Sequence, residues 1–150
     1  MRNRAVSTVV SYVLVLGIVT LLTTMLFISM GGFVDGERQQ TTRSTMEVVG
    51  NGIATDLDAA DRLVQSTDRP GAVELTTEYP DRIVGTQYTI EIERVDSDGL
   101  YEITLRSGDL ELSVTVPVKT KTAVDETTVD GGELEIVYDA ERETLVVQNA

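Results

Sequence analysis

The side chains that most enzymes use for catalysis are scarce in this sequence. It contains no histidine and no cysteine, which excludes disulfides, thiol chemistry, a Ser-His-Asp relay and the usual zinc and haem ligands. Serines such as Ser107 and Ser113 have no base available except a carboxylate, and no glycine-rich phosphate-binding loop is present. We therefore predict that the protein is not an enzyme, with no catalytic residue and no cofactor site.

Carboxylates are the remaining groups that could bind a ligand. The run "DLDAAD" places Asp56, Asp58 and Asp61 within two turns of a helix, and Asp58 and Asp61 share a face that could hold a hard cation such as Ca²⁺. The alternative is the solvated side of an acidic helix, which we favour, so no metal site is predicted. The run "DSDG" at 96–99 matches part of a calcium loop, but Leu100 already belongs to a strand pattern, which predicts a hairpin turn.

The charge of the chain limits its partners. It carries 25 acidic and 12 basic residues, for a net charge of −13, and the only lysines are Lys119 and Lys121. A field this negative repels nucleic acid and anionic lipid headgroups, and we predict no nucleic-acid partner. An acid-rich, lysine-poor surface is typical of halophilic proteins, because in very high salt the Debye length falls to about 3 Å and screens the repulsion.

An uncharged run from Ala5 to Val34 comes near the start of the chain. As a helix it would be about 45 Å long, whereas the hydrocarbon core of a membrane is about 30 Å thick. A secretory signal has a shorter apolar region and a small-residue cleavage motif after it, which "SMGGFVDGE" lacks. The run therefore favours a single membrane span. Arg2 and Arg4 before it, with Asp35 and Glu37 after it, predict a cytoplasmic N-terminus and an extracellular remainder.

The head of this run carries a more specific signal. "NRAVSTVVSYVLVLG" places a basic and then a small residue directly before the apolar segment. This arrangement resembles the class III signal of type IV pilin-like proteins, most closely the haloarchaeal "RAVSPV" kind, and also resembles uncharacterised pilin-like secreted proteins of haloarchaea. The resemblance implies that Arg4, Ala5 and Val6 form a processing site at which prepilin peptidase cuts between Ala5 and Val6. It also implies that the apolar helix is retained and packs in the core of a filament.

The same resemblance implies a set of packing residues and partners. The packing residues are Val9, Val13, Leu16, Gly17, Leu21, Gly32 and Gly36. Gly32 and Gly36 have the Gly-xxx-Gly spacing that lets helices approach closely. The alternative is that this glycine pair loosens the helix during its extraction from the membrane. The partners implied are the prepilin peptidase, other pilin-like subunits of a homo- or hetero-oligomer, an ATPase-driven assembly platform and membrane lipid.

Beyond Val34 the helical pattern continues in amphipathic form. Apolar residues recur at spacings of three and four, which marks one face of a helix: Met46, Val49, Ile53, Leu57, Ala60 and Val64. We expect one helix from about Val6 to Gln65, with a bend near Asn51 because Gly50 and Gly52 weaken it. Pro70 and Gly71 then end it.

The rest of the chain alternates with a period of two. Runs around residues 88–93, 101–106 and 110–116, separated by Gly- and Asp-bearing turns, predict hairpins. "VELTTE" predicts an earlier strand, and "ELEIVYDAERETLVVQ" a closing hairpin around Asp139 to Arg142. We expect an antiparallel meander of five to seven strands, whose apolar face the helical stripe from Met46 to Val64 covers.

The sequence thus predicts an α+β fold in which a long N-terminal helix packs on an antiparallel sheet, as in type IV pilins. Its expected parts are a leader at 1–5, a membrane or filament-core helix at 6–34, an amphipathic helix at 35–66 and a β domain at 72–150. Two functions remain open: a minor or accessory pilin-like subunit, or a single-span anchor that presents its β domain to a ligand and stays in the membrane. A mature N-terminus at Val6 would indicate the first, and one at Met1 or Arg2 the second.

Overall fold

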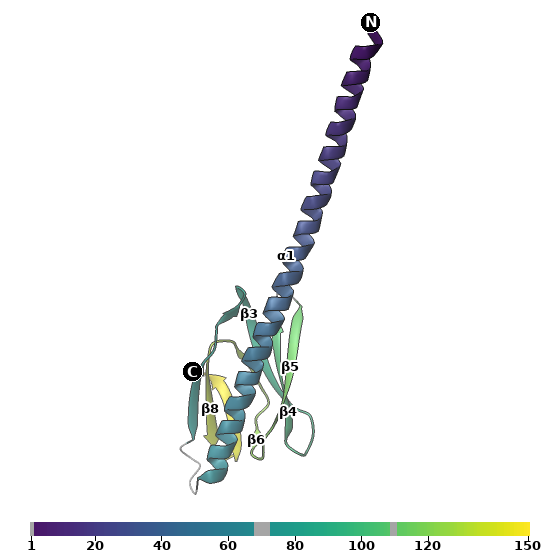
Figure 1. The fold of residues 1–150 in the computed structure, drawn as a ribbon. Coiled ribbons are helices and arrows are strands. Elements are labelled where there is room, and N and C mark those ends of the chain that lie inside the picture. Colours follow the sequence, from purple (N-terminus) through teal and green to yellow (C-terminus); the bar gives the residue numbers. More distant parts are fainter. Residues whose placement is uncertain (1, 68–72, 109–110) are drawn as a thin grey trace. The chain divides into compact units, whose positions relative to one another are not determined.

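The computed structural model describes the backbone of residues 2–67, 73–108 and 111–150, and the side chains of these residues except those of 2–8 and 30–35. The chain divides into two compact units, Met1–Arg38 and Gln39–Ala150. The first unit is helical, and the second contains a helical segment and all the described strands (Figure 1).

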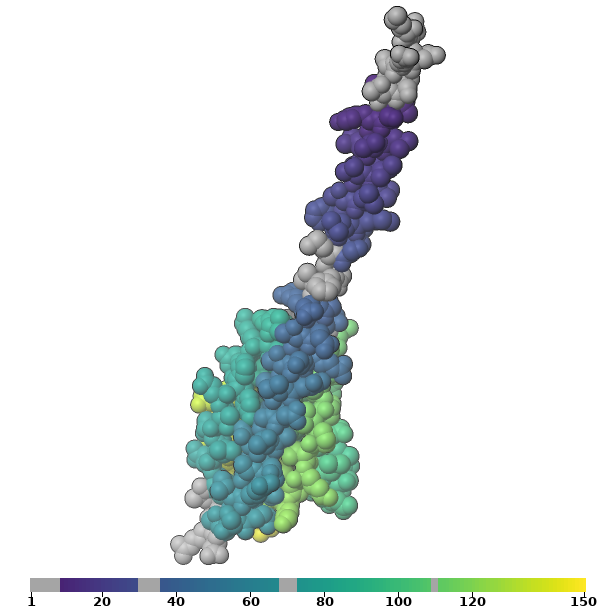
Figure 2. Space-filling model, in the orientation of Figure 1, coloured from purple at the N-terminus to yellow at the C-terminus, as the bar shows by residue number. Residues whose placement is uncertain are grey.

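A single helix, α1, spans Arg2–Ser66 and contributes residues to both units. In the second unit its apolar stripe is buried, as the spacing predicted. Met46, Ile53, Leu57 and Ala60 are 0% exposed. Val49 and Val64 are buried as well, whereas Val48, which lies off the stripe, is 70% exposed. The helix therefore presents one apolar face to the strands, and Figure 2 shows this segment lying across them.

The strands form two sheets. The first has the order β1-β8-β9-β6 and consists of β1 (Glu74–Glu78), β8 (Glu133–Asp139), β9 (Thr144–Asn149) and β6 (Ala123–Val124). The second has the order β2-β3-β4-β5, with β7 also paired to β3. It consists of β2 (Arg82–Ile83), β3 (Thr86–Arg94), β4 (Leu100–Ser107), β5 (Leu112–Lys119) and β7 (Thr127–Asp130).

The α+β class with a helix on antiparallel sheets is confirmed, but the expectation of a single meander of five to seven strands is wrong. The closing hairpin β8–β9 pairs with β1 rather than following β5, so a second sheet forms. The short strands β2 and β6 make further pairings, β2 with β3 and, in parallel, β6 with β9. Strands of two residues, such as β2 and β6, are too short to show an alternating pattern, which is why the sequence did not reveal them.

The two sheets and the helical stripe enclose one hydrophobic core. The apolar strand positions expected from the alternation contribute to it. Those that are buried are Tyr88, Ile90, Ile92, Tyr101, Ile103, Leu105, Val114, Val116 and Ile136, and Leu112 is partly buried against them. Because the residues between them face outward, each strand has one apolar and one polar face.

Two of the three predicted hairpin turns, those at 96–99 and around Asp139, are present with an aspartate organising each one, and the third includes residues 109–110, which lie outside the described residues. Oδ1 of Asp96 accepts hydrogen bonds from the amides of Asp98 (2.8 Å) and Leu100 (3.1 Å). Oδ1 of Asp139 accepts from the amides of Glu141 (2.9 Å) and Arg142 (3.2 Å). Since each carboxylate is used by its own turn, the structure gives "DSDG" the role of a turn.

The outer edge of the second sheet is protected from further pairing. The amide of Thr120 donates to the carbonyl of Gly99 (3.0 Å). Because hydrogen bonding alternates along an antiparallel strand, the backbone amides of Val118, Val116 and Val114 also point to β4, whereas the backbone of the residues between them points to the open edge. Pro117, which has no amide hydrogen, and the charged Lys119 occupy this outward set. Proline and lysine at an edge oppose pairing with a strand of another chain.

The expected bend near Asn51 is absent, since α1 continues without interruption through Gly50 and Gly52 (Figure 1). A Cβ at Gly50 would lie 2.9 Å from Cγ2 of Val116 and 3.1 Å from Cδ1 of Leu105. At Gly52 it would lie 3.1 Å from the ring of Tyr79. These glycines therefore let the helix approach the sheets closely, and the packing holds the helix straight where the sequence alone favoured a kink.

Replacing Gly50 by alanine should lower the free energy of unfolding by about 1–2 kcal/mol. The steric clash of the added methyl group with Val116 should cost more free energy than the higher helix propensity of alanine gains. Chemical denaturation of the full chain in mild detergent measures this. Asn51→Ala is the matched control, because the Asn51 side chain is exposed and donates a hydrogen bond to the carbonyl of Glu47 in the same helix. A Gly50→Ala chain as stable as the parent would contradict the close-packing role.

Candidate functional site

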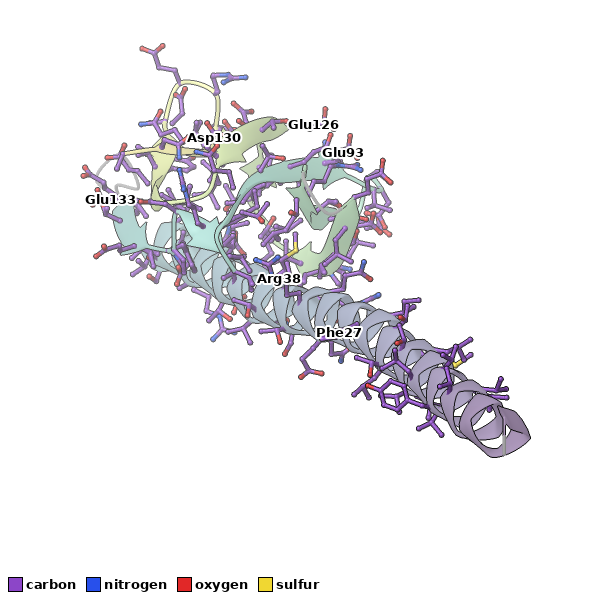
Figure 3. All side chains as sticks on the ribbon, turned by 90° about the horizontal axis from the view of Figure 1, so that it is seen from above. Phe27, Arg38, Glu93, Glu126, Asp130 and Glu133 are labelled. Carbon is purple, nitrogen blue, oxygen red and sulfur yellow. The ribbon has the colours of Figure 1, made fainter. Side chains whose placement is uncertain are left out.

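The most distinctive feature of the first unit is an apolar helical segment whose side chains are exposed. Val9–Ser29 is 21 residues long, with a mean hydropathy of 2.3, and none of it is buried. Phe27 is 70% and Ile28 is 71% exposed, and Figure 3 shows the Phe27 side chain standing out from the helix. The segment has the length and composition of a single membrane span or a signal sequence.

The three threonine hydroxyls within this segment are satisfied by the helix itself. Thr20 donates to the carbonyl of Leu16, Thr23 to that of Val19 and Thr24 to that of Thr20, each at 2.8 Å. A hydroxyl that bonds to its own backbone needs no water. The threonines are therefore compatible with an apolar environment on every side.

One face of the segment is hollowed around a glycine. A shallow groove, open to its surroundings, is lined by Val13, Leu16, Gly17, Thr20, Leu21, Thr24 and Met25. A Cβ at Gly17 would meet nothing within 4 Å. The lining residues recur at spacings of three and four, so they share one helix face. Four of the expected packing residues are thereby brought together.

The remaining predicted residues lie elsewhere. Val9 is exposed on the same helix but does not line the groove, and a Cβ at Gly36 would meet no atom within 4 Å. The side chain position of Gly32 lies outside the described residues. Arg4, Ala5 and Val6 have helical backbone in α1, but their side chains also lie outside the described residues.

The three helical aspartates have separate partners. Asp56 accepts a hydrogen bond from the hydroxyl of Tyr79 (2.5 Å), and Asp58 pairs with Arg62 (2.7 Å). Asp61 is 5% exposed. No three potential ligands gather as a metal site within the part of the chain that the structure describes. All three carboxylates make contacts within the fold.

Asp61 joins α1 to the segment after β5. Its Oδ2 accepts from the amide of Lys121 (3.0 Å) and its Oδ1 from the amide of Thr122 (2.8 Å). Burial raises the pKa of Asp61, but the hydrogen bonds from Thr122 and Lys121 and the charge of Lys121 outweigh this and lower it below its ordinary value of 3.8. The ionised carboxylate is therefore the form that the fold stabilises.

The tyrosines near this helix are structural. Burial, together with the bond to Asp56, raises the pKa of Tyr79, and burial near Asp81 raises the pKa of Tyr88 to about 12. Both hydroxyls stay protonated at neutral pH and donate hydrogen bonds, that of Tyr88 to the carbonyl of Pro80 (2.8 Å). These groups fasten the chain around β1 and β2 to the rest of the second unit.

A second candidate site, which the sequence did not predict, is a cavity of about 820 Å³ in the second unit. It lies among the end of α1, the β3–β4 turn and residues 119–123. Its basic lining residues are Arg62, Arg94, Lys119 and Lys121, and its acidic ones are Asp58, Asp61 and Asp98. The signal that could have revealed it is that both lysines of the chain lie two residues apart.

A glycine and an aspartate shape this cavity. Gly99 has a φ of +81°, and a Cβ there would collide with the carbonyl oxygen of Thr120, so only glycine fits. Asp61 fixes the other side through the amides of Lys121 and Thr122. The positions of Lys119 and Lys121 are therefore set by the fold around them.

The described fold is that of an α+β protein with a pilin-like layout, in which a long N-terminal apolar helix leads into a helical segment packed on antiparallel sheets. The complete chain, residues 1–150, matches the model of a family described as "Family of unknown function (DUF7266)", and the protein belongs to that family. No curated protein and no solved structure matches the chain.

Replacing Asp61 by alanine should lower the free energy of unfolding by about 2–4 kcal/mol at pH 7, because two amides lose a charged acceptor. The pKa of Asp61 is depressed in the fold, so its stabilisation is complete above the ordinary value of 3.8 and is lost as pH falls through the lower folded value. The difference between parent and variant should therefore shrink at pH 3. Denaturation at both pH values measures it.

Asp58→Ala serves as the control, because the Asp58–Arg62 pair is largely exposed and such pairs contribute less than about 1 kcal/mol. If Asp61→Ala were no more destabilising than Asp58→Ala, Asp61 would have no anchoring role.

Proposed function

We propose that this protein is a pilin-like subunit, minor or accessory, of an archaeal type IV filament or a related surface secretion apparatus. The observation that carries the proposal is the uncovered apolar segment Val9–Ser29, which belongs to the same helix as the buried stripe of the second unit. An apolar helix of this length needs lipid or neighbouring protein around it. The apolar helix of a pilin-like subunit is surrounded by lipid before assembly and by neighbouring subunits after it.

Processing is the first step of the proposed mechanism. The residues that resemble a class III signal, Arg4, Ala5 and Val6, precede the apolar segment directly. A prepilin peptidase that cuts between Ala5 and Val6 would remove the leader and keep the whole of Val9–Ser29. This order distinguishes the proposal from a secretory signal, in which the apolar region is lost.

Lateral packing is the second step. The groove around Gly17 is flanked by larger side chains such as Leu16 and Leu21, and it is open to a neighbour. Small residues at a helix surface let a second backbone approach, and in an apolar environment this contact is what draws helices together. We infer that an assembly platform transfers the helix from lipid to contacts of this kind with other pilin-like subunits.

In this proposal the N-terminus is cytoplasmic before processing and the second unit is extracellular, in line with Arg2 and Arg4 on one side of the segment and Asp35 and Glu37 on the other. The role is structural rather than catalytic.

The cavity beside Lys119 and Lys121 favours a second candidate, a single-span protein that remains in the membrane and presents a binding domain. The two candidates share the fold and differ in what happens to the N-terminus. Only the pilin-like subunit is cut before the apolar segment.

Mass spectrometry of the protein from its native cells should give Val6 as the mature N-terminus. Ala5→Glu should accumulate as the full-length precursor in the membrane, because a bulky charged residue replaces the small residue at the cut. Asn3→Ala, two residues upstream, is the control and should be trimmed normally. Normal trimming of Ala5→Glu, or a native N-terminus at Met1 or Arg2, would favour the anchored binding protein.

Gly17→Leu should remove the protein from the sheared surface-filament fraction while leaving membrane insertion and N-terminal trimming intact, because the new side chain fills the groove without adding polarity. An immunoblot of the sheared and membrane fractions measures this. Val19→Phe, which adds apolar bulk comparable to that of Gly17→Leu but outside the groove, should assemble normally. Equal assembly of both variants would show that the groove is not a packing face.

A further inference from the structure

The cavity of the second unit has more positive charge than its own carboxylates neutralise. Asp58 pairs with Arg62, and Asp61 is occupied by the amides of Lys121 and Thr122. Arg94 lies over the ring of Tyr101, 5.5 Å from its centroid. Among the described residues, neither Arg94 nor either lysine forms an ion pair with a carboxylate within 4.0 Å.

The lining as a whole holds four cations, Arg62, Arg94, Lys119 and Lys121, against the three carboxylates of Asp58, Asp61 and Asp98, which leaves a surplus of one positive charge. This surplus stands out in a chain with 25 acidic and 12 basic residues. Figure 3 shows acidic side chains such as Glu93, Glu126 and Asp130 over the strands on the side away from α1. In a molecule that repels anions elsewhere, the cavity is the place where an anion would be held.

The size of the cavity points to an organic ligand. At about 820 Å³ it lies within the range of small-molecule pockets and is much larger than an inorganic ion requires. Its lining also carries neutral polar groups, the amide of Gln65 and the hydroxyls of Ser66 and Ser97. A ligand that matches this lining has several hydroxyl groups as well as negative charge.

The position of the cavity selects carboxylates over phosphates. Phosphate sites commonly use the N-terminus of a helix and a cradle of backbone amides. Here α1 contributes its C-terminal end, from Arg62 to Ser66, and the partial negative charge of that end disfavours a densely charged group beside it. Singly charged carboxylates, spaced along a hydroxylated scaffold, are disfavoured less by that end than a doubly charged phosphate is, and each can pair with one of Lys119, Lys121 and Arg94.

We propose that this cavity binds an acidic oligosaccharide, with Lys119, Lys121 and Arg94 contacting its carboxylates and Gln65, Ser66 and Ser97 its hydroxyl groups. This inference is independent of the filament, because all these residues belong to the second unit. A surface protein with such a site would contact uronic-acid-bearing glycans, and its acidic faces would repel them everywhere else.

Isothermal titration of the full chain in mild detergent and molar KCl tests the proposal, with trigalacturonate as the probe. Trigalacturonate should bind, and the corresponding neutral trisaccharide should not. The double variant Lys119→Gln/Lys121→Gln should weaken binding about tenfold or more, because two charge-assisted contacts are lost. Lys119→Arg/Lys121→Arg should retain most of the binding. This result would show that the positive charge of the two side chains, rather than their exact shape, is what the ligand requires.

Arg43→Gln is the matched control, because it removes an exposed cation that pairs with Glu47 outside the cavity. It should bind trigalacturonate as the parent does, and thermal unfolding should show that all the variants are folded. The proposal is overturned if trigalacturonate does not bind, if the lysine-to-glutamine variant binds equally well, or if the neutral trisaccharide or inorganic phosphate binds as tightly.

Discussion

The structure depends on the burial of one helical stripe, from Met46 to Val64, against two sheets. Each strand presents an apolar face, and neither sheet can cover those faces alone. The stripe enters the same core as residues of both sheets, including Ile90 of β3 and Ile136 of β8. An apolar surface of this kind drives folding because its removal from water is favourable. Around it, Asp56 and Asp61 supply polar contacts that fix where the helix lies.

The same constraint explains why α1 has two characters. From Gln39 onward it has a polar side and an apolar side, because one side has strands to cover. From Val9 to Ser29 it is apolar on every side, and its threonine hydroxyls bond back to the helix. One continuous element thus combines a domain-forming segment with a segment suited to lipid or to neighbouring subunits. The proposed pilin-like function follows from this combination more than from any single residue.

Sequence periodicity was sufficient for the parts of this fold that repeat. The stripe at Met46, Ile53 and Leu57 and the alternation in β3 to β5 follow directly from residue spacing, and the turns at Asp96 and Asp139 follow from local chemistry. The pairing of β1 with β8 could not be predicted, because it depends on contacts between distant segments. The role of Gly50 was misjudged for the same reason: its effect on an isolated helix is known, but its contact with Val116 exists only in the fold. Lys119 and Lys121 were visible in the sequence, yet only the fold brings Arg62 and Arg94 beside them.

The most direct test of the account is to identify what surrounds the apolar helix in living cells. A photo-crosslinking amino acid at Leu21, within the groove, reports its nearest neighbour whether that neighbour is protein or lipid. The account predicts crosslinks from position 21 to this protein or to another pilin-like subunit, and weaker ones from Val19, outside the groove. Crosslinks to lipid alone at both positions, in cells that carry surface filaments, would contradict it.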